Sequence, residues 1–390
     1  MWSKHGHPLA LKMTSVALGL AILCVFLVGC SSSTPLNATP TGVQAPAPSL
    51  EVRPSSIPET SEATQAPVAS PAPTSTPIGT EQSAVTPFSY PLEVPDYRTF
   101  FPAVPPGLGK IANHLIFFSN RTGKYQLYQI DLDGSNLVQL TNNPNLDAYD
   151  MEPAWSPDGK IAFTSKHVDG SWEIFVIYPD RILPVQLTNW GADAWSLTWS
   201  PDSKYLAFVS NATQDDEIYL ISTDGGAPVN LTQRPNANDN LPAWSPDGQH
   251  IAFVSDRAED QFLNIYVMGR DGSEVTRLTE SEVRDTSPDW SPAGDKITFI
   301  SDREGNFEVY VMDVKVNNGV ITTENEPIRL TRTSGYEWSP TWSPDGKLIA
   351  FTSLRDDKEN YEVYVMAPDG SNQTRLTVDP ADDIIPRWWP

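Results

Sequence analysis

The sequence predicts an all-β fold in which six four-stranded blades form a ring. The first observation behind this prediction is a Trp-Ser-Pro phrase that recurs every 44 to 52 residues and returns in altered form at the end of the sequence, at Trp155, Trp199, Trp244, Trp290, Trp342 and Trp388. The second is that short segments rich in β-branched and aromatic residues alternate with turn residues between the copies. A repeat in the forties built from such segments is typical of a β-propeller.

The turns of the repeat follow known chemistry. Pro-Asp-Gly follows three copies of the tryptophan, as at Pro246-Asp247-Gly248, where proline presets φ and glycine accepts a positive φ. Asp-Gly recurs between the third and fourth β-like segments, as at Asp271-Gly272, and is a strong hairpin signal. Each repeat is therefore expected to be a small antiparallel sheet.

Counting the segments predicts how the ring closes. The second, third and fourth segments each occur six times, but the tryptophan segment is missing before the first unit and left over after the last. Residues 384–389 are therefore expected to supply the first strand of the blade that begins near Leu115. Such closure removes a sheet edge that would otherwise template aggregation.

The N-terminal part of the chain is organised differently. Residues 1–29 have a basic start and an apolar stretch from Met13 to Val28, which indicates an export signal. This stretch ends in Leu27-Val28-Gly29-Cys30 and resembles the lipobox of bacterial lipoproteins. That resemblance implies that Cys30 carries the lipid and anchors the chain to a membrane, with an ordinary cleaved signal as the alternative.

Two segments precede the repeats. Residues 30–87 are rich in proline, serine, threonine and alanine and contain no aromatic residue, so they are expected to form a disordered tether. Residues 88–110 hold five aromatic residues among prolines and are expected to form an irregular arm on one face of the propeller. The propeller itself is assigned to residues 111–390.

Composition limits the class of partner. The net charge is −23, which disfavours nucleic acid and suits a soluble extracytoplasmic domain, a cationic partner or divalent cations. The only cysteines are Cys24 and Cys30, so the propeller is expected to hold neither a disulfide nor a cysteine-based metal site. We expect a monomer.

The repeat resembles a known family. The stretch that begins Pro-Ala-Trp-Ser-Pro-Asp-Gly at Pro242 and continues through Ile265-Tyr266-Val267-Met268 to Leu278-Thr279 is similar to the repeat of TolB-type propellers, which also occurs in prolyl oligopeptidase-type peptidases. The resemblance covers about residues 111–390. It implies a cell-envelope or periplasmic scaffold that binds a protein or peptide at one propeller face. TolB has an N-terminal α/β domain where this chain has the tether, which puts a role in the Tol–Pal system in doubt.

No catalytic motif stands out. The hydrolase domain of the related peptidases is missing after the repeats, and no Gly-x-Ser-x-Gly nucleophile elbow is present. The histidines of the repeat region, His114, His167 and His250, fall at different blade positions, so they are not expected to converge on a metal.

One set of residues is a candidate site. An acid stands five residues before most of the repeated tryptophans, and in the unit of Trp199 an aspartate stands one position earlier; the set is Asp150, Asp193, Asp239, Asp285, Glu337 and Asp383. These acids precede the innermost strands and are expected to crowd at one mouth of the central channel. They would then point into solvent, bond to neighbouring backbone to tie blades together, or hold a cation such as calcium or a basic peptide.

The leading functional hypothesis is a non-enzymatic, lipid-anchored extracytoplasmic propeller without a required cofactor. The alternative is a propeller enzyme, a lyase or lactonase-like hydrolase, that acts on an extracellular saccharide or lactone with channel carboxylates and a divalent metal. The tryptophans themselves are expected to be blade core.

Overall fold

The computed structural model describes residues 114–123, 125–139, 151–166, 170–178, 184–258, 262–317, 320–323, 325–356 and 360–388. The export signal, Cys30, the tether, the arm and Asp150 lie outside these residues. The part of the chain that is described contains no helix with the length and apolar character needed to cross a membrane.

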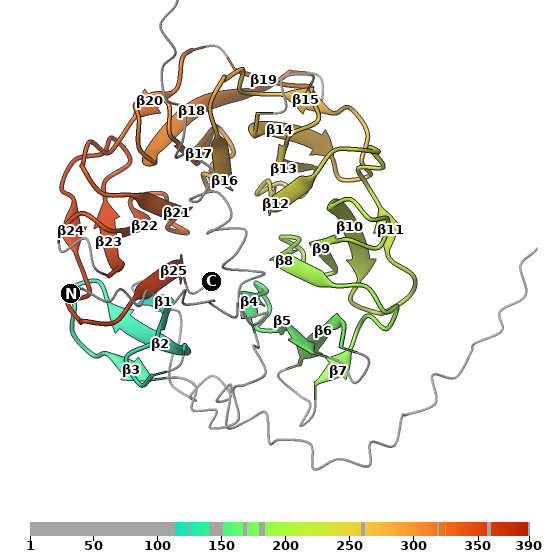
Figure 1. Ribbon diagram of the computed structural model, residues 1–390, viewed down its shortest axis with the longest axis horizontal. Helices are drawn as coiled ribbons and strands as arrows, with labels where there is room; N and C mark the ends of the chain where they lie inside the picture. The colour runs from blue at the N-terminus through green and yellow to red at the C-terminus, as the bar shows by residue number, and fades with distance from the viewer. Residues whose placement is uncertain are drawn as a thin grey trace, which may run out of the picture. The chain divides into compact units, whose positions relative to one another are not determined.

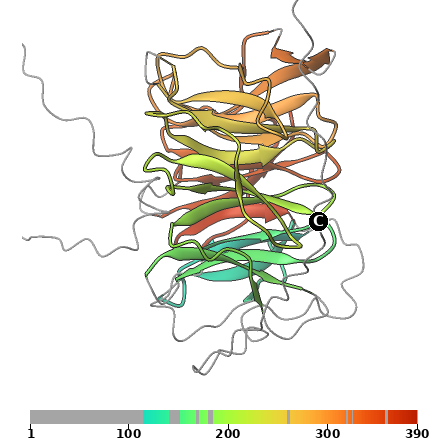
Figure 2. The same cartoon turned by 90° about the vertical axis from the view of Figure 1, so that its right-hand side faces the viewer.

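The described residues form six antiparallel sheets around a central axis (Figures 1 and 2). Blade 1 consists of β25 (Asp383–Trp388), β1 (His114–Ser119), β2 (Gln126–Asp131) and β3 (Val138–Gln139). Blade 2 consists of β4 (Met151–Trp155), β5 (Ile161–Lys166), β6 (Trp172–Ile177) and β7 (Val185–Gln186). Blade 3 consists of β8 (Ala194–Trp199), β9 (Tyr205–Ser210), β10 (Glu217–Ser222) and β11 (Val229–Asn230). Blade 4 consists of β12 (Asp239–Trp244), β13 (His250–Ser255), β14 (Asn264–Gly269) and β15 (Thr276–Arg277). Blade 5 consists of β16 (Asp285–Trp290), β17 (Lys296–Ser301), β18 (Glu308–Asn317), β19 (Val320–Thr323) and β20 (Ile328–Arg329). Blade 6 consists of β21 (Glu337–Trp342), β22 (Ile349–Ser353), β23 (Glu362–Met366) and β24 (Thr374–Arg375). The predicted six-bladed fold is confirmed.

The closing strand lies where the repeat count placed it. β25 pairs antiparallel with β1, with Leu115 opposite Trp388 and Ser119 opposite Asp383. The Trp388 Nε1–H also donates to the carbonyl of Thr341 in blade 6 at 3.0 Å. The closing strand is therefore tied to both of its neighbours.

Each blade has an aromatic core that follows from the period-two pattern of its strands. A phenylalanine on the second strand stacks on the aromatic residue opposite it on the third strand, with ring centroids 5.7–6.0 Å apart; the pairs are Phe117–Tyr128, Phe163–Phe175, Phe208–Tyr219, Phe253–Tyr266, Phe299–Tyr310 and Phe351–Tyr364. The repeated Trp199, Trp244, Trp290, Trp342 and Trp388 are buried as well. They are core residues, as predicted.

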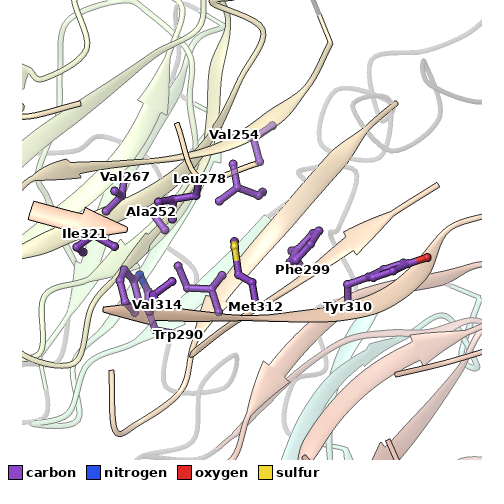
Figure 3. Packing of buried hydrophobic residues seen from close by; sticks show 12 residues of the cluster. Ala252, Val254, Val267, Leu278, Trp290, Phe299, Tyr310, Met312, Val314 and Ile321 are labelled. Atoms are coloured by element: carbon purple, nitrogen blue, oxygen red, sulfur yellow. The ribbon is translucent and has the colours of Figure 1, made fainter. Parts of the chain in front are cut away.

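Neighbouring blades share apolar layers. Figure 3 shows the layer between blades 4 and 5, where Ala252, Val267 and Leu278 of blade 4 face Trp290 and Met312 of blade 5. Sheets that pack face to face in this way bury both inner surfaces.

The longer fifth repeat corrects one expectation. The extra segment Val314 to Pro327 lies between the third and fourth strands of the fifth repeat, a position that predicts a loop on the rim. In the structure β18 instead runs on to Asn317, and β19 returns along it as a hairpin. Val314 and Ile321 are buried in the layer between blades 4 and 5. The insertion is thus packed because it places two branched apolar residues against the neighbouring blade.

The innermost strands of blades 1 and 3 to 6 each carry a bulge; they are β25, β8, β12, β16 and β21. The third residue of each strand has a positive φ of 47–54°; these residues are Ser196, Leu241, Ser287, Ser339 and Ile385. The pairing register shifts at the same place. A positive φ is costly for a branched residue such as Ile385, so the surrounding blades must impose it.

Substitution of Gly272 by alanine is expected to destabilise the propeller strongly. The added Cβ would overlap the Leu231 carbonyl oxygen of blade 3, and φ is +83°. We expect a loss of at least ~3 kcal/mol in the free energy of unfolding. The matched control is Gly123→Ala, with φ of +87° but open space around the Cβ, and an expected loss of ~1 kcal/mol. Urea unfolding of both variants measures the difference, and equal losses would contradict the close approach of the two blades.

Candidate functional site

The predicted acids stand at equivalent places but are not exposed. Asp239, Asp285, Glu337 and Asp383 each open the innermost strand of a blade, and all four side chains are completely buried. Each lies opposite the last residue of the second strand, which is a serine in all four blades. The solvated arrangement therefore does not apply to these four carboxylates.

An arginine two positions after that serine neutralises each acid. The guanidinium Nη2 lies 2.7–3.3 Å from the carboxylate, and Nε donates to the serine Oγ at 2.8–2.9 Å; the pairs are Arg121–Asp383, Arg257–Asp239, Arg303–Asp285 and Arg355–Glu337. We call this unit of acid, serine and arginine the arginine clip. It connects the innermost strand with the end of the second strand.

The same arginines cover the aromatic core. Each guanidinium lies 4.6–5.7 Å from the ring centroids of the stacked phenylalanine and tyrosine of its own blade. Such cation–π contacts add to the ion pair when the cation is partly desolvated. One arginine thus holds three strands of a blade together.

The backbone of these acids joins adjacent blades. The amide of Asp239 donates to the carbonyl of Asp216 in blade 3 at 2.7 Å, and that of Asp383 donates to Tyr361 in blade 6 at 2.7 Å. Asp285 and Glu337 make the equivalent bonds to Leu263 and Phe307. These backbone bonds tie one blade to the next, whereas the structural alternative assigned that role to the side chains of the acids.

Asp193 behaves differently from the other predicted residues. Its Oδ1 accepts a hydrogen bond from the amide of Trp172 in blade 2 at 3.0 Å. Asp382, at the same repeat position, accepts from the amide of Tyr361 at 3.1 Å. Asp193 therefore ties blade 3 to blade 2 through its side chain and belongs to no clip.

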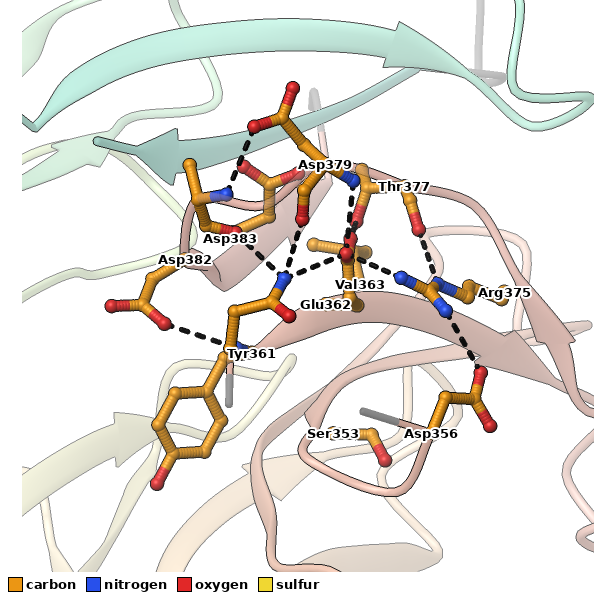
Figure 4. A network of polar contacts seen from close by, with 12 residues as sticks. Ser353, Asp356, Tyr361, Glu362, Val363, Arg375, Thr377, Asp379, Asp382 and Asp383 are labelled. Carbon is orange, nitrogen blue, oxygen red and sulfur yellow. Dashed lines mark hydrogen bonds and ion pairs between the residues drawn. The ribbon is translucent and has the colours of Figure 1, made fainter. Parts of the chain in front are cut away.

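A second set of buried acids was not among the predicted site residues. Glu173, Glu217, Glu308 and Glu362 lie at the start of the third strands of blades 2, 3, 5 and 6 and are almost fully buried. In blade 6 the carboxylate of Glu362 accepts from the amide of Asp379 at 3.0 Å and pairs with Arg375 at 2.5 Å (Figure 4). A glutamate two positions before the third-strand aromatic residue in four of the six blades was the available signal. These residues fix the loop between the fourth strand and the next blade.

Asp289 was also missed because it occurs in only one blade. It precedes Trp290, and its Oδ2 accepts a hydrogen bond from the amide of Trp342 in blade 6 at 2.7 Å. Burial raises the pKa of Asp289 to about 6, against the opposing effects of the Trp342 amide and Arg387. It is a further carboxylate that joins two blades.

Burial raises the pKa of several of these acids despite their partners. For Asp285, Glu337 and Asp383 the loss of hydration outweighs the nearby guanidinium and the hydrogen bonds that lower the pKa. For Asp345, an exposed turn aspartate, hydrogen bonds from Lys347 and Ser343 instead lower the pKa to about 2.

Stability is therefore expected to rise when the pH falls from 7 to about 5. Acids with a raised pKa bind protons more tightly in the folded state, so their contribution is present below the unfolded pKa and is lost as the pH rises through the folded pKa. Asp289 alone contributes at most about 3 kcal/mol. Turn aspartates such as Asp345 have the opposite sign, so stability should fall again below pH 4.

Melting temperatures measured between pH 3 and pH 8 check this pH dependence. Asp289→Asn should flatten the curve between pH 5 and pH 7. A melting temperature that rises steadily up to pH 8 would contradict the raised pKa values.

The arrangement gives the predicted acids structural partners. Within the ranges that the structure describes, no group of three or more histidine, cysteine, aspartate or glutamate side chains is placed to hold a metal ion. Calcium binding at the channel acids stays a prediction, tested by melting with and without calcium: a calcium-dependent rise should disappear in Asp239→Asn with Asp285→Asn.

Comparisons with known proteins agree with this geometry. The family described as TolB beta propeller domain matches residues 199–326. A Chlorobaculum tepidum protein described as a TolB homolog is 36% identical over 62 residues, which are 16% of this chain and 14% of that protein.

Solved structures extend the likeness to the whole ring. TolB from Acinetobacter baumannii is 22% identical, with a TM-score of 0.57 over 71% of this chain and 66% of that one. A putative TolB from Agrobacterium tumefaciens is 24% identical, with a TM-score of 0.52 over 71% of this chain and 99% of that one. At these identities the likeness shows the fold, and the chain spans only part of the first TolB and a small part of the Chlorobaculum protein.

Six blades closed into a ring by β25, four of them with buried clips, define a β-propeller scaffold. The recurring repeat and the comparisons specify its type: this chain carries a TolB-like six-bladed β-propeller.

Proposed function

We propose that this chain is a non-enzymatic binding scaffold, held outside the cytoplasm by a lipid on Cys30, whose propeller binds a protein or another ligand at one face. The observation that carries the proposal is the use of the charged residues. Four channel-side acids are neutralised by arginines of their own blades, so they serve to hold strands together. The likeness to TolB propellers supports the same scaffold role.

The anchor is tested with the full chain expressed in a bacterial host. The wild type should partition with membranes and gain the mass of acyl groups at Cys30, and Cys30→Ser should lose both. A wild-type chain that is cleaved elsewhere and recovered without lipid would overturn the anchoring.

The binding role is tested by cross-linking in intact cells. Cross-links to a partner should map to the loops of one propeller face, and they should compete with added purified protein. Turnover of a saccharide or lactone by the purified chain would overturn the non-enzymatic part of the proposal.

A further inference from the structure

Blade 3 lacks the arginine clip that four other blades carry. Ala194 stands in the place of the acid and Ala212 in the place of the arginine. Ser210, opposite Ala194, is completely buried and its Oγ has no hydrogen-bond partner. In the four clipped blades the equivalent serine Oγ accepts from an arginine Nε. Blade 3 therefore lacks both the acid and the arginine of the clip but keeps the serine that bonds to the arginine in the other blades.

Trp190 fills part of the space that the arginine occupies in the clipped blades. The Trp190 ring lies 4.9 Å from the Tyr219 ring and 6.0 Å from the Phe208 ring, both edge-on, over the pair that arginine covers elsewhere. Trp190 is half-buried and therefore still accessible. Trp195 on β8 is also half-buried, and its Nε1–H donates to Asn240 Oδ1 at 3.3 Å.

Three acids that precede β8 and β10 in blade 3 have no cationic partner among the described residues. The loop from Asn211 to Asp216 contains no lysine or arginine and ends in two aspartates, Asp215 and Asp216. Among the residues that the structure describes, no salt bridge reaches Asp193, Asp215 or Asp216; they accept hydrogen bonds from the Trp172 amide, the Asn236 amide and the Asn240 side chain. Burial and the neighbouring acids Asp215, Asp256 and Asp239 raise the pKa of Asp216, against the opposing effect of Asn240.

We propose that the mouth of blade 3 binds an arginine or lysine side chain of a basic segment in a protein partner, which supplies the cation that the clipped blades provide themselves. A guanidinium can lie on an exposed indole face and donate to a carboxylate at the same time. The net charge of −23 attracts such a segment toward the domain. The inference rests on the proposed scaffold function and names the place and chemistry of its contact.

The test uses the full chain with Cys30 intact, solubilised in detergent, at 150 mM salt. The probe is an acetylated, amidated tetra-arginine peptide, with tetra-glutamate as its negative control. The readout is the indole N–H signals of ¹⁵N-tryptophan-labelled protein, with that of Trp190 assigned from Trp190→Phe. Tetra-arginine should shift the Trp190 signal saturably, and tetra-glutamate should not.

Two matched pairs of substitutions separate this site from general attraction. Asp215→Asn with Asp216→Asn should weaken tetra-arginine binding at least tenfold. The control pair, Asp133→Asn with Asp271→Asn, removes the same charge from the exposed turns between the third and fourth strands of blades 1 and 4. It should change the affinity for tetra-arginine less than twofold. Equal losses in the two pairs, or no saturable shift in the wild type, would overturn the inference.

A third variant installs the missing clip. Ala194→Asp with Ala212→Arg should abolish the tetra-arginine shift while the melting temperature is kept or raised. Undiminished binding by a folded variant would also overturn the inference, and the two aspartate pairs decide the matter if this variant does not fold. A partner cross-linked in cells with equal yield to wild type and to Asp215→Asn with Asp216→Asn would leave the scaffold function standing and remove this site alone.

Discussion

Deletion of residues 384–390 is expected to abolish cooperative folding of the propeller. It removes most of β25, and with it the buried side chains of Ile384 and Trp388 and the bond from Trp388 Nε1 to Thr341. Loss of one buried tryptophan alone costs about 3–5 kcal/mol, and a typical domain has only about 5–15 kcal/mol in total. The deletion also exposes β1 as an open sheet edge, so aggregation should accompany the loss.

Thermal melting and size-exclusion chromatography measure this effect. Trp388→Phe is the graded control, since it keeps most of the aromatic volume but loses the indole hydrogen bond. We expect it to melt between the wild type and the deletion. A deletion variant that stays monomeric with an unchanged midpoint would show that blade 1 does not depend on β25.

Substitution of Arg303 by methionine is expected to produce the second large effect. Asp285 would remain completely buried without its guanidinium, and Ser301 and the Phe299–Tyr310 pair would lose their cover. Breaking one partner of a buried ion pair costs about 3–5 kcal/mol because an uncompensated charge is left inside. Urea unfolding at pH 7 should show this loss, and it should shrink at pH 5, where Asp285 accepts a proton more readily.

The double variant Asp285→Leu with Arg303→Met is the decisive companion. Replacement of a whole buried ion pair by apolar residues is often neutral, so the double variant should recover most of the lost stability. Blade 3 is a natural precedent, since Ala194, Ala212 and Trp190 replace the charged unit there. Additive losses from the two substitutions would show that the arginine and the acid do not act as one unit.

Much of the fold could be predicted because its signals repeat. The recurring tryptophan, the turn residues and the count of strand-like segments led to six blades and to the closing role of β25. The hairpin of β18 and β19 could not be foreseen in this way. The hairpin occurs in one blade, so no repeat signals it. Val314 and Ile321 are buried only because the neighbouring blade packs against them.

The site was predicted only in part. The acids keep a fixed distance from the tryptophan and could be predicted from it, but their burial depends on arginines that lie far from them in the sequence. Arg257 stands 18 residues after Asp239 and meets it only when the first two strands pair. The spacing of the two charges can be read from the sequence. Their neutralisation depends on the strand register, which brings them together.

The pairing of β1 with β25 also has a consequence for the order of folding. Leu115 and Trp388 lie at opposite ends of the folded region and become neighbours only in the finished ring. A chain that folds as it emerges can complete blades 2 to 6 in sequence, while β1 waits for a strand made last. Contacts between such distant segments form slowly. Blade 1 is therefore expected to be the last part of the ring to form.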